Sequence, residues 1–126
     1  ELILCKKGTL SNLNSLNSLF LNSNLISFIE KDFFSSIKNL KILKFNNNRL
    51  KVIKKEYFQD LLKLNELYIK SNQISDIESN SFEKLVDLEV LDLSKNCLFK
   101  LDSNVFASNK NLLQLYLYMN VLHSLN

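Results

Sequence analysis

Apolar and polar positions alternate along this chain in a pattern that returns every 24 residues. The clearest copy, LEVLDLSKN, runs from Leu88 to Asn96 and is followed by Leu98, Leu101 and Phe106. It corresponds to the template L-x-x-L-x-L-x-x-N-x-L-x-x-L, with a later Phe. The same template begins at Leu16, Leu40, Leu64 and Leu112. Five copies in register, without an insertion or deletion, indicate an array of equivalent structural units.

Each copy predicts one short strand and a return segment. In the x-x-L-x-L-x-x part, side chains two residues apart point to the same face of a strand. The side chains expected to point inward are Leu19, Leu21, Leu43, Phe45, Leu67, Ile69, Leu91, Leu93, Leu115 and Leu117. One such strand cannot be stable alone, so we expect the copies to stack into a parallel sheet over a continuous core. The return segment lacks a sustained helical period, which predicts turns, short 3₁₀ pieces or one helical turn.

Two further columns recur at fixed positions of the repeat. An asparagine ends every strand where the chain turns inward, and its amide can pair with backbone groups that water does not reach. We therefore expect a structural ladder formed by Asn24, Asn48, Asn72, Asn96 and Asn120. On the return side we expect a stacked spine formed by Phe34, Phe58, Phe82 and Phe106.

This repeat length and its Leu/Asn pattern resemble the leucine-rich repeat family. The late Phe is similar to the typical 24-residue subclass, which occurs in Toll-like receptors, Slit proteins and other ectodomains. The resemblance implies an α/β-type solenoid, a right-handed curved superhelix with a parallel β-sheet on its concave face. Its convex side would be mostly irregular, 3₁₀ or short helical.

The repeats account for the whole chain as one domain, residues 1–126. A partial unit occupies residues 1–15, and the repeats start at residues 16, 40, 64, 88 and 112. Because the chain begins and stops inside a unit, we expect a fragment of a longer array. Its last strand would leave an unpaired edge, which predicts either a continuation of the array or end-to-end self-association. No apolar run reaches the ~18 residues that span a membrane.

Composition and charge narrow the classes of function. The chain is 46% hydrophobic and contains one Gly and no Pro, which excludes a disordered or collagen-like sequence. Residues 38–63 hold eight basic and two acidic side chains, whereas residues 64–92 hold two basic and seven acidic ones. A nucleic acid would require a continuous basic track. The neighbouring acidic unit therefore makes nucleic acid an unlikely partner and favours a bipolar protein contact.

One column on the return side changes its character along the chain. Leu4, Phe28 and Val52 are apolar, but the equivalent residues Asp76 and Lys100 are charged. We interpret the apolar part as a flank that another domain covers.

Candidate chemistry is scarce. His123 is the only histidine, and no catalytic, phosphate-binding or calcium-binding motif accompanies it. Cys5 takes the inward position of Ile29 one repeat later, and Cys97 follows a ladder asparagine. The two cysteines are four repeats apart, roughly 19 Å at the usual strand spacing, which exceeds the ~7 Å limit for a disulfide. We expect no enzyme activity, no metal and no cofactor.

The outward face of the sheet is the candidate binding surface. Its side chains include aromatic residues beside charges of both signs, as in protein interfaces. The predicted ligand-binding residues on this concave face are Phe20, Lys44, Tyr68, Lys70, Asp92, Tyr116, Tyr118 and Met119. Two other interpretations stay open: exposed aromatics also suit a pleated surface, and the last three residues could contact a neighbouring unit instead of a ligand.

The resemblance implies a non-catalytic protein-recognition module. It would be the ligand-binding part of a receptor, adhesion or matrix protein, extracellular or at the cell surface, with a signalling role in innate immunity if it follows the Toll-like group. An intracellular scaffold or adaptor is the alternative, because the sequence has no N-x-S/T glycosylation site and no cysteine-rich cap. Cytoplasmic localisation therefore stays open, and a nucleic-acid-sensing receptor segment is the third hypothesis.

Overall fold

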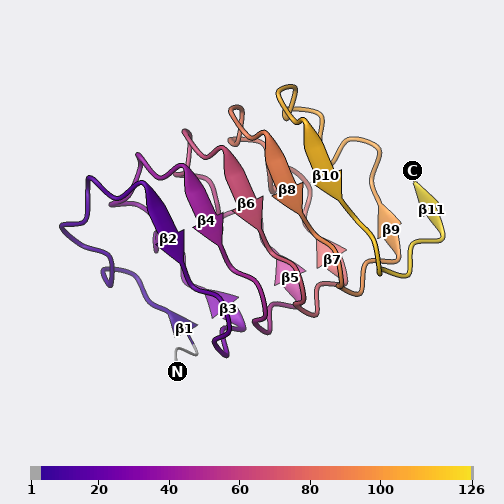
Figure 1. Cartoon of the computed structure of the whole chain (residues 1–126), viewed down its shortest axis with the longest axis horizontal. Coiled ribbons are helices and arrows are strands. Elements are labelled where there is room, and N and C mark those ends of the chain that lie inside the picture. Colours follow the sequence, from indigo (N-terminus) through magenta and orange to yellow (C-terminus); the bar gives the residue numbers. More distant parts are fainter. Residues whose placement is uncertain (1–3, 126) are drawn as a thin grey trace.

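The five template strands form one parallel sheet. The computed structural model describes residues 4–125, with the backbone alone for residues 124 and 125. Successive coils place one strand each side by side in the order β10-β8-β6-β4-β2 (Figure 1). The strands are β2 (Ser18–Phe20), β4 (Ile42–Lys44), β6 (Glu66–Tyr68), β8 (Val90–Asp92) and β10 (Gln114–Tyr116). Each residue pairs with the one 24 positions away, as Leu43 does with Leu67, which confirms the predicted solenoid.

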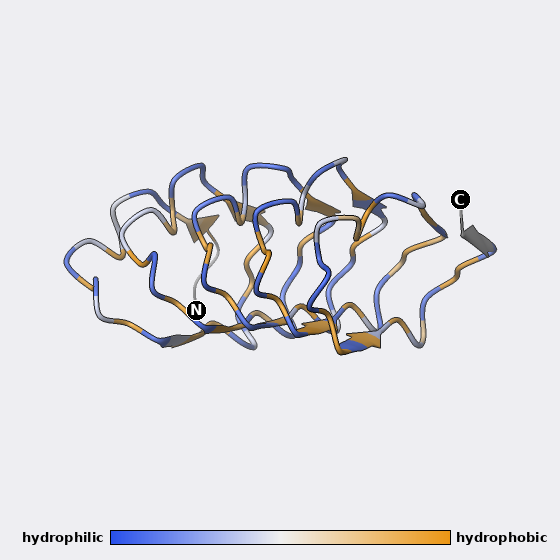
Figure 2. Cartoon of the chain, turned by 90° about the horizontal axis from the view of Figure 1, so that it is seen from above, coloured by the Kyte–Doolittle hydropathy of each residue, from blue (hydrophilic) through white to orange (hydrophobic). Residues whose placement is uncertain are grey.

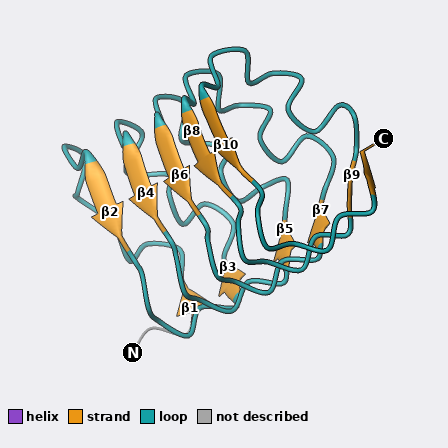
Figure 3. Cartoon of the chain, turned by 45° about the vertical axis from the view of Figure 1, so that its right-hand side comes forward, coloured by secondary structure: helices purple, strands orange, loops and turns teal. Residues whose placement is uncertain are grey.

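A second row of two-residue strands lies across the core from this sheet (Figure 3). It consists of β1 (Leu4–Cys5), β3 (Phe28–Ile29), β5 (Val52–Ile53), β7 (Asp76–Ile77), β9 (Lys100–Leu101) and β11 (Ser124–Leu125). They pair in parallel as β1-β3, β5-β7 and β9-β11. This row was not predicted from the sequence, because a strand of two residues is too short to show an alternation of apolar and polar positions.

The return segments are irregular turns. Hydrogen bonds between residues three apart, such as Phe33 N–H to the Glu30 carbonyl at 3.1 Å, hold them in shape. Over residues 4–125 neither 3₁₀ nor α-helix forms, so the expectation of 3₁₀ or short helical pieces is wrong. The same residues contain no helix long and apolar enough to cross a membrane.

The core fills the space between the two rows of strands. Leu43, Leu67 and Leu91 are fully buried, and apolar segments recur at the same place in successive coils (Figure 2). At the ends of the array the inward residues are less covered: Leu19 is partly buried and Leu115 is 37% exposed. The aromatic residues of the return segments stack, with centroid distances of 6.3 Å between Phe58 and Phe82 and 5.9 Å between Phe82 and Phe106.

Asparagine side chains connect each coil to the preceding one. Asn72 Nδ2 donates to the carbonyl oxygen of Phe45 at 3.1 Å, while its Oδ1 accepts from the N–H of Leu50 at 3.1 Å. Asn48, Asn96 and Asn120 make the same two kinds of bond. These bonds satisfy backbone groups inside the turn and hold adjacent coils in register.

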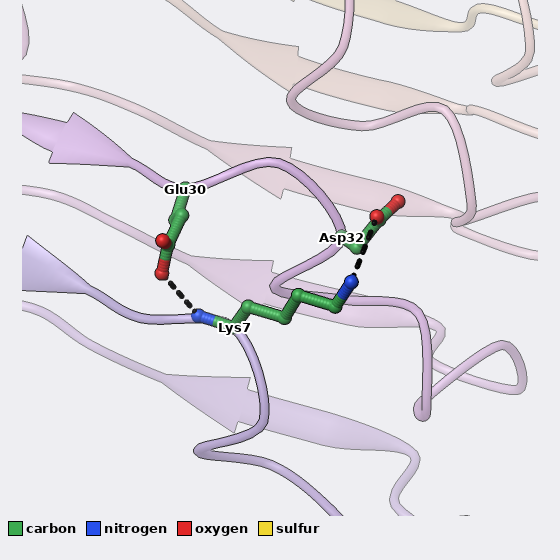
Figure 4. Close-up of polar contacts among 3 residues, drawn as sticks. All are labelled: Lys7, Glu30 and Asp32. Carbon is green, nitrogen blue, oxygen red and sulfur yellow. Dashed lines mark hydrogen bonds and ion pairs between the residues drawn. The ribbon is translucent and has the colours of Figure 1, made fainter.

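A glutamate supports the second row where its strands pair. Glu30 Oε2 accepts a hydrogen bond of 2.6 Å from the backbone N–H of Lys7, one coil earlier (Figure 4). The Lys7 ammonium lies 3.6 Å from Asp32. Glu78 repeats the first contact two coils later, accepting from the N–H of Lys55 at 2.8 Å. A carboxylate bonded to a backbone amide is a strong, directional contact.

Candidate recognition surface

The central residues of the five-stranded sheet form one continuous row. We call the outward-pointing side chains of β2, β4, β6, β8 and β10 the sheet face. The strand register places five of them side by side in the order Phe20, Lys44, Tyr68, Asp92 and Tyr116. Neighbours in this row lie on adjacent strands, whose backbones are about 4.8 Å apart. Along this row, three aromatic side chains therefore alternate with one cation and one anion.

Lys44 lies between two rings. Its Nζ is 5.1 Å from the ring centroid of Phe20 and 5.4 Å from that of Tyr68. Both distances are within the ~6 Å range of cation–π attraction. The two contacts hold the lysine upright on the sheet face, where its charge stays accessible to a ligand.

Tyr68 is fixed by the neighbouring carboxylate. Its hydroxyl donates a hydrogen bond of 2.7 Å to Oε2 of Glu66, two residues earlier on the same face of the strand. Burial, followed by the hydrogen bond with Glu66, raises the pKa of Tyr68 to about 12. The phenol therefore remains a neutral donor at physiological pH.

Asp92 is nearly buried, although it belongs to the sheet face. Its exposed fraction is 9%, because it lies between Tyr68 and Tyr116 on the adjacent strands. Its Oδ1 accepts two hydrogen bonds, from the backbone N–H of Ser94 at 2.9 Å and from the Ser94 hydroxyl at 2.5 Å. The carboxylate is thus a fixed, partly desolvated acceptor.

Lys70 reaches across one coil to Tyr118. Its Nζ lies 5.6 Å from the Tyr118 ring centroid, two coils away. Ser94 occupies the equivalent position in the intervening coil, where its small side chain is fully buried. The hydrogen bond with Lys70, and then that with Ser94, lowers the pKa of the Tyr118 hydroxyl, and the same Lys70–Tyr118 bond raises the pKa of Lys70. The pair forms a second charged-aromatic contact beside the central row.

The remaining predicted residues lie at the two ends of the sheet face. Phe20 is 61% exposed on β2. Tyr116 is exposed on β10, and Tyr118 and Met119 are exposed just beyond the end of that strand. Met119 lies in the turn after the strand and has a left-handed backbone, with φ of 57°. The structure thus joins Lys44, Tyr68 and Asp92 in the centre and separates Phe20 from the Tyr118 cluster.

Two asparagines at the edge of the sheet face were missed by the sequence analysis. Asn22 Oδ1 accepts from the backbone N–H of Asn46 at 2.7 Å, and Asn46 Oδ1 accepts from the N–H of Lys70 at 2.8 Å. Their spacing of 24 residues was the available signal. They extend the hydrogen-bonded edge and set the backbone direction at Lys70.

This surface suits binding better than bond-breaking chemistry. It offers aromatic rings, two ammonium groups and a fixed carboxylate, and the Ser94 hydroxyl that donates to this carboxylate is fully buried. Among the described residues no group of three histidine, cysteine, aspartate or glutamate side chains could hold a metal. Cys5 is buried and Cys97 is exposed, and both are free thiols.

Comparison with known proteins agrees with this architecture. The family model described as "Leucine rich repeat" matches residues 38–98. Among solved structures, a crystal structure of a TLR13-ssRNA13 complex superposes with a TM-score of 0.87 at 31% sequence identity. The match covers 90% of this chain and 16% of the TLR13 chain, so the present chain spans a small part of that protein's length. No curated protein sequence matches.

The family and structural matches coincide with the repeating coils of the chain. Residues 38–98 include β4, β6 and β8, the three central strands of the sheet, with their ladder asparagines. The strand register, the core packing and the asparagine contacts all repeat from one coil to the next. Over residues 38–98 the chain therefore matches the leucine-rich repeat family, and its coils are similar to those of the TLR13 structure.

Proposed function

We propose that this chain is a non-catalytic protein-recognition module whose partner binds the sheet face. The observation that supports the proposal best is the central row, in which Lys44 lies between two rings and Asp92 lies between two tyrosines. Rigid aromatic anchors beside fixed charges carry most of the free energy in protein interfaces. The side chains in the contact would be Phe20, Lys44, Tyr68, Lys70, Asp92, Tyr116, Tyr118 and Met119.

The setting that we propose is the ectodomain of a receptor, adhesion or matrix protein. Similarity to the TLR13 structure supports a receptor segment. An intracellular scaffold would use the same surface in another compartment. Surface labelling of intact cells with a membrane-impermeant reagent separates the two, because only an ectodomain becomes labelled.

The sheet face can be tested by replacing Tyr68, Tyr116 and Tyr118 together with alanine and measuring recovery of bound proteins in a quantitative pull-down. A matched control replaces Leu62 and Val86, which are exposed apolar residues of the return segments, with serine. We expect the tyrosine variant to lose most of the partner, since hot-spot truncations cost about 2 kcal/mol or more each. Equal recovery by both variants would contradict the proposal.

Single-stranded RNA is a second candidate ligand, supported by one specific observation. Both lysines of the sheet face lie against aromatic rings, Lys44 against Tyr68 and Lys70 against Tyr118, and such groups also bind single strands. The solved TLR13 structure is itself an RNA complex. Asp92 and Glu66 oppose this ligand by repelling phosphates. RNA binding would weaken steeply with salt, whereas a mixed-charge protein contact would change less.

A further inference from the structure

The second row of strands is paired at some junctions and open at others. β1 pairs with β3 and β5 with β7, but β7 does not pair with β9. At a paired junction, the backbone N–H of the residue after the second strand donates a hydrogen bond to the first strand. Glu78, which follows β7, donates in this way to the carbonyl oxygen of Ile53 in β5 at 2.9 Å. Within the described residues, Asp102 makes no such bond to Ile77.

The side chain after each strand explains the difference. Glu30 and Glu78 reach back to a backbone N–H of the previous coil. The equivalent residues at the open junctions are Lys54 and Asp102. Asp102 is one methylene shorter, and its Oδ1 instead accepts from the N–H of Asn104 in its own turn at 3.0 Å. The junction between β7 and β9 is therefore not closed by a carboxylate.

A pocket of about 360 Å³ opens at this junction. Its lining includes the apolar side chains of Ile77, Leu101 and Val105 and the carboxylates of Asp76 and Asp102. Ile77 is only partly buried, although the equivalent Ile53 is fully buried. The volume falls in the range of pockets that hold small ligands or single side chains.

The chain itself shows which group fits such a junction. Between β3 and β5, which are also unpaired, Tyr57 is 5% exposed and its ring packs edge-on against Phe28 at 6.2 Å. Position 57 corresponds to Val105 two coils later. Both residues end the same kind of turn, because their N–H groups donate to the carbonyl three residues earlier at 3.0 and 3.1 Å. Because valine has no ring, the space that Tyr57 fills is empty beside Val105.

Charged side chains lie at the rim of the pocket. Where the β3–β5 junction has Phe28 and Lys54, the β7–β9 junction has exposed Asp76 and Asp102. Lys100 lines the pocket as well, and its ammonium lies 5.8 Å from the ring centroid of Phe99. The surrounding residues 64–92 are also strongly acidic. A cationic group next to an inserted ring would meet these carboxylates.

We propose that the pocket between β7 and β9 receives a tyrosine side chain of a partner protein, with a basic residue next to that tyrosine. This site belongs to the second row of strands and does not depend on the function proposed for the sheet face (Figure 3). It also explains why the column that begins with Leu4 becomes charged at Asp76. The two charged residues of this column, Asp76 and Lys100, both line the pocket.

Short acetylated, amidated peptides provide the direct test. Lys-Tyr-Lys, Glu-Tyr-Glu and Lys-Ala-Lys are titrated into the ¹⁵N-labelled chain, and amide shifts are followed by NMR. We expect saturable shifts at Ile77, Leu101 and Val105 with Lys-Tyr-Lys, about fivefold weaker binding of Glu-Tyr-Glu, and no saturable shift with Lys-Ala-Lys. Shifts confined to the sheet face, or equal binding of the three peptides, would overturn the proposal.

Two substitutions close the pocket in different ways. Val105→Tyr supplies the ring from within, and Asp102→Glu gives the carboxylate the reach to bond the previous coil. Both should abolish the saturable shifts, and Val105→Tyr should raise the melting temperature by about 3 °C by burying the ring. Lys84→Ala, at an exposed residue that does not line the pocket, should leave peptide binding unchanged. Undiminished binding by either folded closing variant would overturn the proposal.

Discussion

Asn96 Nδ2 donates a buried hydrogen bond of 3.0 Å to the carbonyl oxygen of Ile69, in the preceding coil. Its Oδ1 accepts from the N–H of Ile74 at 3.1 Å. One side chain thus satisfies a donor and an acceptor of the same buried turn. The register between coils depends on such contacts as well as on the strands.

Replacing Asn96 with leucine should lower the free energy of unfolding by about 3 kcal/mol, because buried backbone groups lose their partners. Chemical denaturation followed by circular dichroism measures this change. Asn14→Leu, at an exposed asparagine, is the matched control and should change stability by less than about 0.5 kcal/mol. A similar loss in both variants would show that the bond to Ile69 has no special role.

Stability should fall at high pH. Burial and the Glu66 contact raise the pKa of Tyr68 from its ordinary 10.0 to about 12, and burial raises that of Cys5 from 9.0 to about 12. Between these values the folded chain retains protons that the unfolded chain has released, so unfolding becomes easier as pH rises from about 9 to 12. Tyr68→Phe should flatten the dependence between pH 10 and 12. An unchanged slope would argue against a raised pKa at Tyr68.

The two thiols should differ in reactivity. Cys97 is exposed, whereas Cys5 is buried and the pKa of its thiol is raised to about 12 by burial. A thiolate is the reactive form. A disulfide reagent at pH 8 should therefore modify one thiol in the folded chain and two in denaturant. Rapid modification of both thiols without denaturant would contradict the packing at Cys5.

The turn after each strand carries backbone strain at one repeated position. Ser23, Asn47, Ser71, Lys95 and Met119 all have a left-handed backbone, with φ between 53° and 59°. Asparagine tolerates this region better than lysine. Lys95→Asn should raise the free energy of unfolding by about 0.5–1 kcal/mol. Lys84→Asn is the control at a residue without positive φ, and an equal gain there would exclude this explanation.

The period of 24 residues made most of the fold predictable. Because parallel pairing joins equivalent positions, the neighbours of Leu43 and Tyr68 follow from arithmetic on the sequence. The alternation of inward and outward side chains along each strand then identifies the core residues. The second row of strands was not predictable in this way, since two-residue strands such as β5 depend on where the return turns happen to pack.

Side-chain size explains what the sequence analysis missed at the surfaces. Asp92 lies on the predicted sheet face, but its coverage depends on the bulk of Tyr68 and Tyr116 beside it. The pocket between β7 and β9 depends on Val105 being smaller than its equivalent, Tyr57. Both features arise from contacts between different coils, which a pattern within one repeat does not report.

Photo-crosslinking at position 68 tests the recognition surface most directly. Tyr68 is replaced by p-benzoylphenylalanine in the protein as its own cells produce it, and Leu62, an exposed return-segment residue, is replaced in a parallel variant. We predict a nuclease-resistant, protease-sensitive adduct at position 68 and none at position 62. Absence of an adduct at position 68, equal adducts at both positions, or an adduct that nuclease removes would contradict protein recognition by the sheet face.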